Sequence, residues 1–229
     1  MMEREKVIEV KDLVKRFGSF TANDRLTFDV YRGEIFGFLG ANGAGKTTAM
    51  RILCGLSRPT SGKVTVAGID SGRPEEIKKR IGYMSQRFSL YEDLTVSENI
   101  ELYGGIYGMT MRKIRPRREE LLRRLNFTGY GDTLILALPL GIRQKLAFAV
   151  ALFHKPEIVF LDEPTSGVDP VTRRQFWEMI YETASRGITV FVTTHYMDEA
   201  EYCDRITIMN EGRIVALDTP SALREQYGT

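Results

Sequence analysis

A glycine-rich stretch joins an apolar segment to a predicted helix, and this junction constrains the fold more than any other feature of the chain. Residues 40–48 read Gly-Ala-Asn-Gly-Ala-Gly-Lys-Thr-Thr. The apolar run over residues 34–39 is typical of a buried strand, and residues 46–54 have a helical pattern. Strand, glycine loop and helix in this order predict an α/β fold whose loop presents successive backbone N–H groups to one anion.

The residue types of this loop suit the phosphates of a nucleotide better than a simple turn. Its glycines let the backbone curl around an anion, and the helix that follows directs its positive end at the same place. Lys46 adds a mobile positive charge for the outer phosphates, and Thr47 offers a hydroxyl to Mg²⁺. The residues expected to contact the phosphates are Gly40, Asn42, Gly43, Ala44, Gly45, Lys46, Thr47 and Thr48.

Composition and charge exclude several classes of protein. A chain of 229 residues can form one sizeable core, and 32 basic against 30 acidic residues leave a net charge of only +2. This balance is not that of a surface built to bind nucleic acid. Cys54 and Cys203 lie in apolar patterns, so we expect buried free thiols. No apolar run reaches the roughly 20 residues of a membrane-spanning helix, so a membrane role would require a partner.

Alternating apolar and polar residues predict strands in the first and last thirds of the chain. In the first third, turns are expected at Asn23-Asp24 and Arg32-Gly33. In the last third, buried strands alternate with helices, which predicts a mostly parallel sheet. The expected elements are strands over 7–13, 26–31, 63–67, 158–161 and 187–193, a helix over 171–184, a hairpin of 206–209 with 213–217, and a helix from Thr219-Pro220.

The middle of the chain has a helical pattern. Thr95 and Glu98 have the spacing of a capping box, which opens a helix expected to end near Tyr107. Further helices are expected over 116–126 and 141–153. We therefore predict a single domain over residues 1–229, in which about 1–87 and 154–229 form the core with a β sub-domain, and about 88–153 form a helical sub-domain.

A second motif ends the strand at 158–161 with two carboxylates, Asp162 and Glu163. At the carboxyl end of a parallel strand they would lie beside the phosphate loop. Asp162 would anchor Mg²⁺, through water, and Glu163 would polarise an attacking water as general base. Alone, Asp-Glu-Pro is better explained as the end of a strand, since such endings are common, but its combination with the phosphate loop favours nucleotide hydrolysis.

The order of these motifs resembles the nucleotide-binding domain of ATP-binding-cassette (ABC) transporters, from Val7 to Gln226. The resemblance implies a P-loop NTPase with a RecA-like α/β core, an antiparallel β sub-domain and a helical sub-domain. It implies ATP and Mg²⁺ as ligands, and ATP hydrolysis coupled to transmembrane transport. It also implies work as a dimer with a second ATP-binding domain, beside a permease subunit at the cytoplasmic face of the membrane.

Four more residues match the family's pattern. Phe17 resembles the aromatic residue on which adenine stacks, and Gln86 the glutamine that reaches Mg²⁺ and the attacking water. Asp169 lies in a loop that resembles the one crossing to the partner domain. His195 resembles the switch histidine that contacts the γ-phosphate. Each of these alone would suit a structural role, and His154, which matches no motif, is expected to be structural.

The chain departs from the family at its signature, typically Leu-Ser-Gly-Gly-Gln. Here it reads Leu138-Pro139-Leu140-Gly141. Pro139 removes a hydroxyl and an N–H, and Leu140 restricts backbone approach to a phosphate, while Gly141 keeps a donor beside the positive helix end. Losing one charge-assisted donor costs about 1.5–3 kcal/mol, which would weaken closure of the dimer without abolishing it.

Two interpretations of this signature remain open. It is either a degenerate half-site in a pair of unlike domains or a lineage-specific variant that still works. With residues 194–201, this form resembles the exporters of the drug-efflux and sodium-efflux type. The chain most resembles the second of two ATPase domains fused in tandem.

The segment 87–94 resembles a groove for a short cytoplasmic helix of the permease, although Phe88, Leu90 and Tyr91 also suit a buried core. Basic residues over 112–124 read as a solvated helix face or, alternatively, as a contact for anionic lipid or an acidic partner loop. No nucleic acid is expected. The alternatives to an exporter ATPase are a soluble ABC-type ATPase acting on ribosomes or DNA, and a regulatory domain that senses ATP without turnover.

Overall fold

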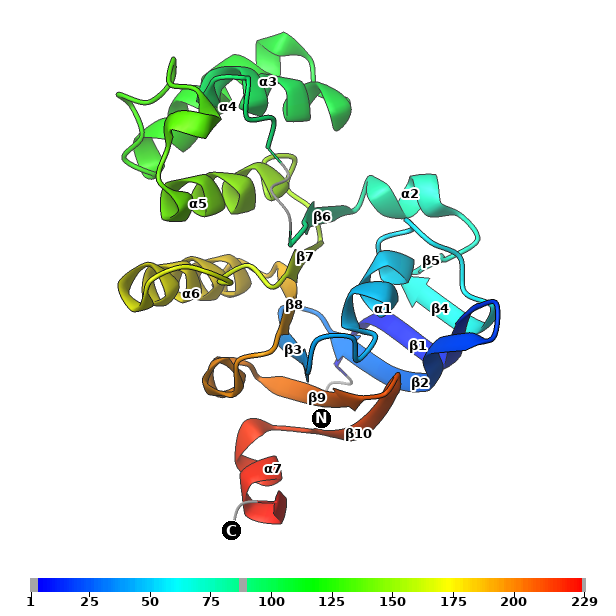
Figure 1. Cartoon of the computed structure of the whole chain (residues 1–229). Coiled ribbons are helices and arrows are strands. Elements are labelled where there is room, and N and C mark those ends of the chain that lie inside the picture. The colour runs from blue at the N-terminus through cyan, green and yellow to red at the C-terminus, as the bar shows by residue number, and fades with distance from the viewer. Residues whose placement is uncertain (1–3, 87–89, 228–229) are drawn as a thin grey trace.

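In the computed structural model, which describes residues 4–86 and 90–227, a mostly parallel sheet forms the centre of the molecule (Figure 1). Within this described part, six strands run in the order β10, β9, β3, β8, β7, β6. Neighbouring strands are parallel except β9 and β10, which form the predicted hairpin. The strands are β3 (Ile35–Gly40), β6 (Ile81–Met84), β7 (Ile158–Asp162), β8 (Thr189–Thr194), β9 (Arg205–Asn210) and β10 (Arg213–Asp218).

A second, antiparallel sheet lies beside the first and has the order β2, β1, β4, β5 in the described residues. It corresponds to the expected β sub-domain. Its strands are β1 (Lys6–Phe17), β2 (Phe20–Tyr31), β4 (Ser61–Val66) and β5 (Ile69–Asp70). Five aromatic rings fill the space between the sheets, with centroids 5.2 to 6.3 Å apart. They belong to Phe28, Phe36, Phe38, Phe160 and Phe191.

The turn predicted at Asn23-Asp24 is wrong. Both residues lie inside β2, and the chain turns instead at Gly18, which has a φ of 59°. Asn23 is fully buried and its amide nitrogen donates a hydrogen bond to the Gly45 carbonyl, 3.0 Å away. Tertiary packing therefore overrides the turn propensity of Asn and Asp at this position.

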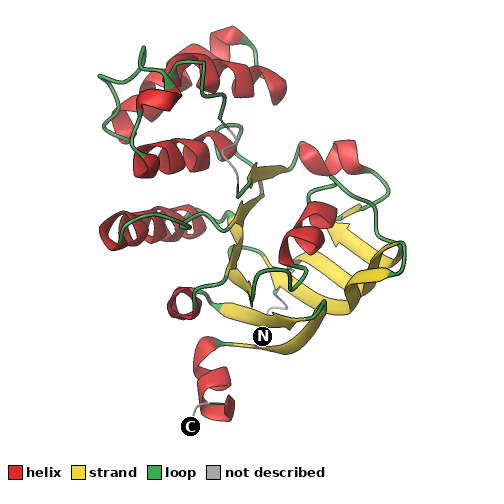
Figure 2. Cartoon of the chain, in the orientation of Figure 1, coloured by secondary structure: helices red, strands yellow, loops and turns green. Residues whose placement is uncertain are grey.

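Helices flank the central sheet on both sides: the one that follows the glycine loop packs between the two sheets, others lie on the opposite side, and three gather away from the antiparallel sheet (Figure 1 and Figure 2). This group, α3 to α5, corresponds to the expected helical sub-domain. The helices are α1 (Lys46–Leu53), α2 (Pro74–Lys78), α3 (Val96–Ile106), α4 (Met111–Arg124), α5 (Leu140–Ala151), α6 (Pro170–Ser185) and α7 (Pro220–Tyr227), with the 3-10 helices η1 (Ile135–Ala137) and η2 (Met197–Tyr202).

The starts of α3 and α4 show where local sequence signals predict a helix boundary correctly and where they do not. The capping box is confirmed: Thr95 Oγ1 accepts from the Glu98 N–H, and Glu98 accepts from the Thr95 N–H. The predicted start of the next helix at Pro116 is wrong, because α4 begins at Met111 and contains Pro116. Buried Ile114 anchors this first turn against the core, and that packing offsets the hydrogen bond that proline cannot donate.

Two cysteines and a histidine lie inside the fold. Cys54 and Cys203 are both buried and free, as expected. His154 packs between the helical group and the central sheet: its Nε2 lies 2.9 Å from the Ile81 carbonyl, and its ring stacks on Tyr107 at 3.7 Å. Burial lowers the pKa of His154 to about 4, so the ring is neutral near pH 7. In the described ranges, no helix has both the length and the apolar character to cross a bilayer.

Candidate nucleotide-binding site

The glycine loop connects β3 to α1, and its glycines are required by its geometry. Gly43 and Gly45 have φ values of 82° and 98°, which glycine adopts without strain. A Cβ on Gly45 would lie 2.4 Å from the Ala22 carbonyl oxygen. The backbone therefore curls at the start of α1, which is the geometry that lets successive N–H groups surround an anion.

Two distant segments support the loop from behind. Asn23 of β2 donates to the Gly45 carbonyl at 3.0 Å, and the Gly212 N–H, in the β9–β10 turn, donates to the Ala44 carbonyl at 3.1 Å. The sequence does not indicate this role of Asn23, because asparagine is typical of turns. Strict alternation from the buried Leu26, Phe28 and Val30 would also place Asn23 on the opposite face, and it is the irregular register between Leu26 and Asn23 that turns it inward.

Lys46 lies at the centre of the loop. Its ammonium group donates to the carbonyls of Gly40 and Ala41, at 2.7 and 3.1 Å, and lies 3.4 Å from Glu163 Oε1. The side chain is only 4% exposed. A cation held this deep in the loop is positioned to contact the outer phosphates of a nucleotide.

Asp162 ends β7 and is almost completely buried. Its Oδ1 accepts hydrogen bonds from Thr193 Oγ1 at 2.7 Å and from Thr47 Oγ1 at 3.3 Å. Burial raises the pKa of the Asp162 carboxyl, and the bonds from Thr193 and Thr47 oppose that rise. A divalent cation beside Asp162 would favour its ionised form.

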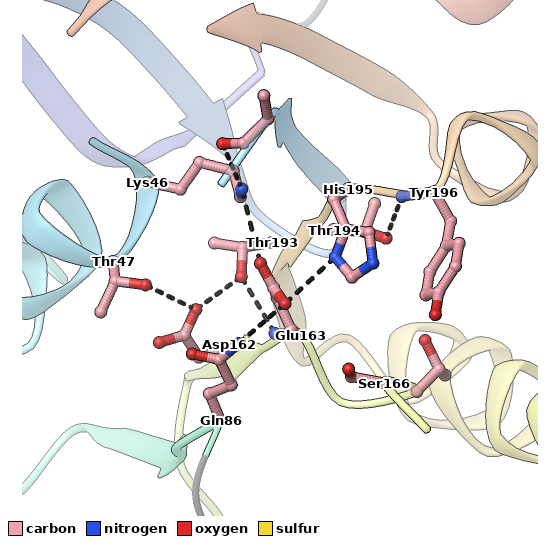
Figure 3. A network of polar contacts seen from close by, with 12 residues as sticks. Lys46, Thr47, Gln86, Asp162, Glu163, Ser166, Thr193, Thr194, His195 and Tyr196 are labelled. Atoms are coloured by element: carbon pink, nitrogen blue, oxygen red, sulfur yellow. Dashed lines mark hydrogen bonds and ion pairs between the residues drawn. The ribbon is translucent and has the colours of Figure 1, made fainter. Parts of the chain in front are cut away.

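The oxygen atoms available here suit Mg²⁺. Thr47 offers a hydroxyl, Asp162 a carboxylate and Gln86 an amide, all from one small region (Figure 3). Mg²⁺ prefers oxygen ligands and is usually held by one or two carboxylates together with substrate phosphates. In the described chain, His, Cys, Asp and Glu do not form a group of three or more that could hold a metal by themselves.

Glu163 connects the predicted catalytic groups. Its carboxylate accepts from Gln86 Nε2 at 2.9 Å and lies 3.1 Å from His195 Nδ1, in addition to the contact with Lys46 (Figure 3). Its backbone has a φ of 47°, which is strained for a residue with a side chain. The Glu163 N–H donates to Thr193 Oγ1 at 3.0 Å, which helps to hold that conformation.

The parallel sheet explains why these residues meet. Strands β6, β7 and β8 are adjacent and parallel, so their carboxyl ends lie at one edge of the sheet. Gln86, Glu163 and His195 each follow one of these strands. The rule that ligands bind at this edge in open α/β sheets therefore accounts for the whole cluster.

Three predicted site residues lie outside this cluster. Phe17 ends β1, is 55% exposed and has Lys15 Nζ 5.0 Å from the centre of its ring. Asp169 caps α6, accepting from the Thr172 N–H at 3.0 Å. Gly141 lies at the start of α5, where a Cβ would come within 2.6 Å of Thr172 Cγ2. Gly141 and Asp169 are therefore both close to Thr172, and a side chain at position 141 would have to displace that of Thr172.

The altered signature opens α5 one residue earlier than predicted. Pro139 is the cap residue, and its carbonyl accepts from the N–H groups of Ile142 and Arg143, both at 3.0 Å. Proline at the cap position removes no bond within the helix, because α5 starts at Leu140. Leu138 is buried beneath it, whereas Pro139 is exposed.

Three buried polar residues that hold the site together were not predicted from the sequence. Thr193 and Thr194 end β8, and Glu199 lies in η2, each no more than 1% exposed. Two consecutive threonines after an apolar strand were a visible signal. The burial of Glu199 was not visible, since an acidic residue in a short polar segment normally faces solvent.

These elements together define a P-loop nucleotide-binding domain: a central parallel sheet, a phosphate loop, and carboxylates at the adjoining strand ends. The chain belongs to the ABC transporter family, whose model matches residues 23–166. The family and the fold class expected from the sequence are thereby confirmed.

Relatives of the chain include several ATP-binding proteins. It is 48% identical over 223 residues to the probable multidrug ABC transporter ATP-binding protein YbhF of Escherichia coli (strain K12). This match covers 97% of this chain and 39% of that protein. It is 39% identical to the daunorubicin resistance ATP-binding protein DrrA2 of Streptomyces coeruleorubidus, covering 96% of this chain and 69% of that protein. The chain thus spans well under half the length of YbhF.

Solved structures show the same fold. An ATP-binding subunit of an ABC transporter is 29% identical, with a TM-score of 0.86, and the match covers 97% of this chain and 93% of that one. The dimeric, post-hydrolysis ATP-binding cassette MJ0796 bound to ADP and Pi is 26% identical, with a TM-score of 0.84, over 93% of this chain and 98% of that one.

Proposed function

We propose that the chain binds Mg·ATP and hydrolyses its γ-phosphate to power a membrane exporter of the multidrug-efflux type. The observation that carries this proposal is the position of Glu163. Its carboxylate contacts Lys46, Gln86 and His195 and adjoins Asp162 at the sheet edge that faces the phosphate loop. The relatives described as multidrug and daunorubicin resistance ATP-binding proteins support the transport class.

Binding is assigned to the loop and to one aromatic residue. The backbone N–H groups over residues 40–48 and the start of α1 surround the phosphates, and Lys46 contacts the outer ones. Phe17, exposed at the tip of the antiparallel sheet, offers a ring face for adenine. Thr47, Asp162 and Gln86 would hold Mg²⁺, and the ion would neutralise charge that develops on the phosphates.

Hydrolysis is assigned to the cluster around Glu163. Its carboxylate accepts a proton as a water oxygen attacks the γ-phosphorus and the bond to the ADP oxygen breaks. Gln86 orients that water. His195 donates to the γ-phosphate, and Lys46 leaves its contact with Glu163 to bind the same group. The strained backbone of Glu163 fixes the carboxylate in the direction of the loop.

A second ATP-binding domain completes the site. Asp169 and Gly141 are joined through Thr172 and lie apart from the Glu163 cluster, so we assign them to contact with the partner and its nucleotide. The dimeric cassette among the structural relatives is consistent with such a pair. Whether like or unlike domains pair depends on the rest of the transporter.

A permease subunit is the proposed membrane partner, and it would hold the chain at the cytoplasmic face. Leu90 is buried, Tyr91 is 50% exposed, and Phe88 lies outside the described residues. A cavity of about 430 Å³ opens between α2 and the end of α3, beside the 61% exposed Ile106. We assign Tyr91 and this cavity to the permease contact. On the basic helix α4, Ile114 and Leu122 are buried, and Arg118 pairs with Glu101 of α3 and with Glu119; we assign the remaining basic residues to a solvated face.

Co-purification distinguishes an exporter ATPase from a soluble ATPase acting on ribosomes or DNA. An affinity-tagged chain, expressed in its native cells and extracted in mild detergent, is expected to retain a polytopic membrane protein. Its recovery should persist after nuclease treatment. Substituting exposed Ile106 with Glu should reduce it, whereas substituting Val215, exposed on the opposite hairpin, should not. Recovery of ribosomal RNA or DNA in place of a membrane protein would contradict the transport assignment.

The altered signature is expected to slow hydrolysis. Changing Pro139→Ser and Leu140→Gly restores a hydroxyl, an N–H and close backbone approach. We expect the ATPase kcat to rise about ten-fold, since one charge-assisted hydrogen bond contributes about 1.5–3 kcal/mol. Steady-state phosphate release measures this, with Leu136→Ser, at a 64% exposed position just upstream, as control. An unchanged rate would show that the Pro-Leu form is fully competent.

A further inference from the structure

One carboxylate outside the proposed catalytic cluster is completely buried. Glu199 lies in η2 with a relative exposure of 0%. Both of its oxygens accept short hydrogen bonds: Oε1 from Thr165 Oγ1 at 2.5 Å, and Oε2 from Thr194 Oγ1 at 2.6 Å. An acidic side chain is almost never fully buried unless it is paired, so this arrangement calls for a specific reason.

The two threonines belong to the two loops that adjoin Glu163. Thr165 comes two residues after Glu163 and opens the loop that ends at Asp169. Thr194 ends β8 and directly precedes His195. The Thr194 hydroxyl also accepts a hydrogen bond from the Tyr196 N–H at 3.0 Å (Figure 3). The residues before and after His195 are therefore both held by the Thr194 hydroxyl.

A guanidinium on a neighbouring helix lies beside this buried carboxylate. Arg173 of α6 places its Nε 3.6 Å from Glu199 Oε1, and its guanidinium lies over the Tyr196 ring at 4.2 Å. Arg173 thus contacts both the carboxylate and the residue after His195. Removing one partner of a buried charged group leaves the other uncompensated, which is costly. The loop around His195 is therefore strongly restrained relative to α6.

The loop from Thr165 to Asp169 is also fixed to the signature helix. Gln144 of α5 donates to the Ser166 carbonyl at 3.2 Å, and Asp169 accepts from the start of α6. Contacts therefore continue from α5, through this loop and Glu199, to His195. In this chain of contacts Glu199 alone bonds both loops by its own side chain.

We propose that Glu199 is a positioning residue that locks the His195 loop to the loop over residues 165–169, so that both move as one unit when the domains close on ATP. This inference rests on the proposed function, in which His195 contacts the γ-phosphate and Asp169 faces the partner domain. Glu199 would not touch the nucleotide. It would set the spacing between His195, which contacts the γ-phosphate, and Asp169, which contacts the partner domain.

The experiment compares variants that remove single bonds without changing shape. Glu199→Gln, Thr165→Val and Thr194→Val each remove an acceptor or a donor, whereas Thr165→Ser and Thr194→Ser retain the hydroxyl. Glu201→Gln, in the same 3-10 helix with a 51% exposed side chain that pairs with Arg224 and not with Arg173, is the matched control. Amide hydrogen exchange is measured without nucleotide, and ATPase kcat and KM are measured with it.

We expect exchange over 165–169 and 194–199 to accelerate together by about ten-fold in the Gln and Val variants, with no change in α4. We expect kcat to fall about ten-fold with KM for ATP within about two-fold, and the Ser variants to behave as wild type. In the double variant Thr165→Val/Glu199→Gln, kcat should fall no further than in either single variant, because both changes break the same connection between Thr165 and Glu199.

Several results would overturn the proposal. Exchange that is unchanged, or that accelerates in one loop only, would show that Glu199 does not lock the two together. An equal loss of kcat in the Val and Ser variants, or a KM that rises while kcat is retained, would show that Glu199 contributes only to packing and does not position the loops. A wild-type chain without ATPase activity would instead refute the proposed function, and the exchange data would still decide whether the lock exists.

Discussion

Substituting Lys46 with Met is expected to abolish ATP binding. The ammonium group lies 3.4 Å from Glu163 and is buried within the loop. Methionine retains the length and the apolar stem but cannot donate to a phosphate oxygen. Charge-assisted bonds to phosphate are about twice as strong as neutral ones, so we expect a loss of affinity of at least about a hundred-fold.

Isothermal titration with ATP in the presence of Mg²⁺ measures this loss. Lys63→Met, at an exposed position in β4, serves as the control and should bind as wild type does. Circular dichroism of both variants tests whether the fold survives, since Lys46→Met leaves Glu163 without its cation at 3.4 Å. A folded Lys46→Met variant that binds ATP with unchanged affinity would exclude Lys46 from the phosphate site.

Substituting Glu163 with Gln is expected to stop turnover while ATP binding persists. The amide has nearly the same shape, but it cannot accept the proton of the attacking water. Loss of a general base typically lowers a rate by 10²- to 10⁴-fold, and we expect kcat to fall by about that factor. Affinity should be retained or rise, because Lys46 no longer pairs with a carboxylate and is more available to phosphate.

Single-turnover phosphate release, together with titration of ATP, separates the two effects. Glu157→Gln is the matched control, because Glu157 adjoins the opposite end of β7 and pairs with Arg80 at the surface. Partly exposed ion pairs contribute little, so this control should retain activity. If the folded Glu163→Gln variant hydrolyses ATP at the wild-type rate, another group must be the base.

Much of the fold could be predicted because local and global signals agree. The phosphate loop, the apolar strand before it and the alternation of strands with helices all indicate one parallel sheet. Prediction failed where a tertiary contact overrides a local preference. Asn23 is typical of a turn, but it lies inside β2, where its amide donates a hydrogen bond to the Gly45 carbonyl. Pro116 is typical of a helix start, but buried Ile114 anchors a helical turn that comes before it.

The candidate site divides in the same way. Asp162, Glu163 and His195 could be placed because the carboxyl ends of adjacent parallel strands meet at one edge, whatever the side chains are. The contacts that orient these residues could not be placed. Which hydroxyl faces Asp162, and that Glu199 is buried, depend on side-chain directions that strand order alone does not determine.

The support behind the phosphate loop has a consequence for how such a domain can change over evolutionary time. Because the Ala22 carbonyl lies where a Gly45 side chain would be, and the β9–β10 turn bonds Ala44, the loop is shaped by both ends of the chain. The phosphate-loop motif is local in sequence, but its conformation depends on contacts with β2 and with the β9–β10 turn, which are remote in sequence. Substitutions in the first strands or the last hairpin can therefore tune nucleotide affinity while the motif itself stays unaltered.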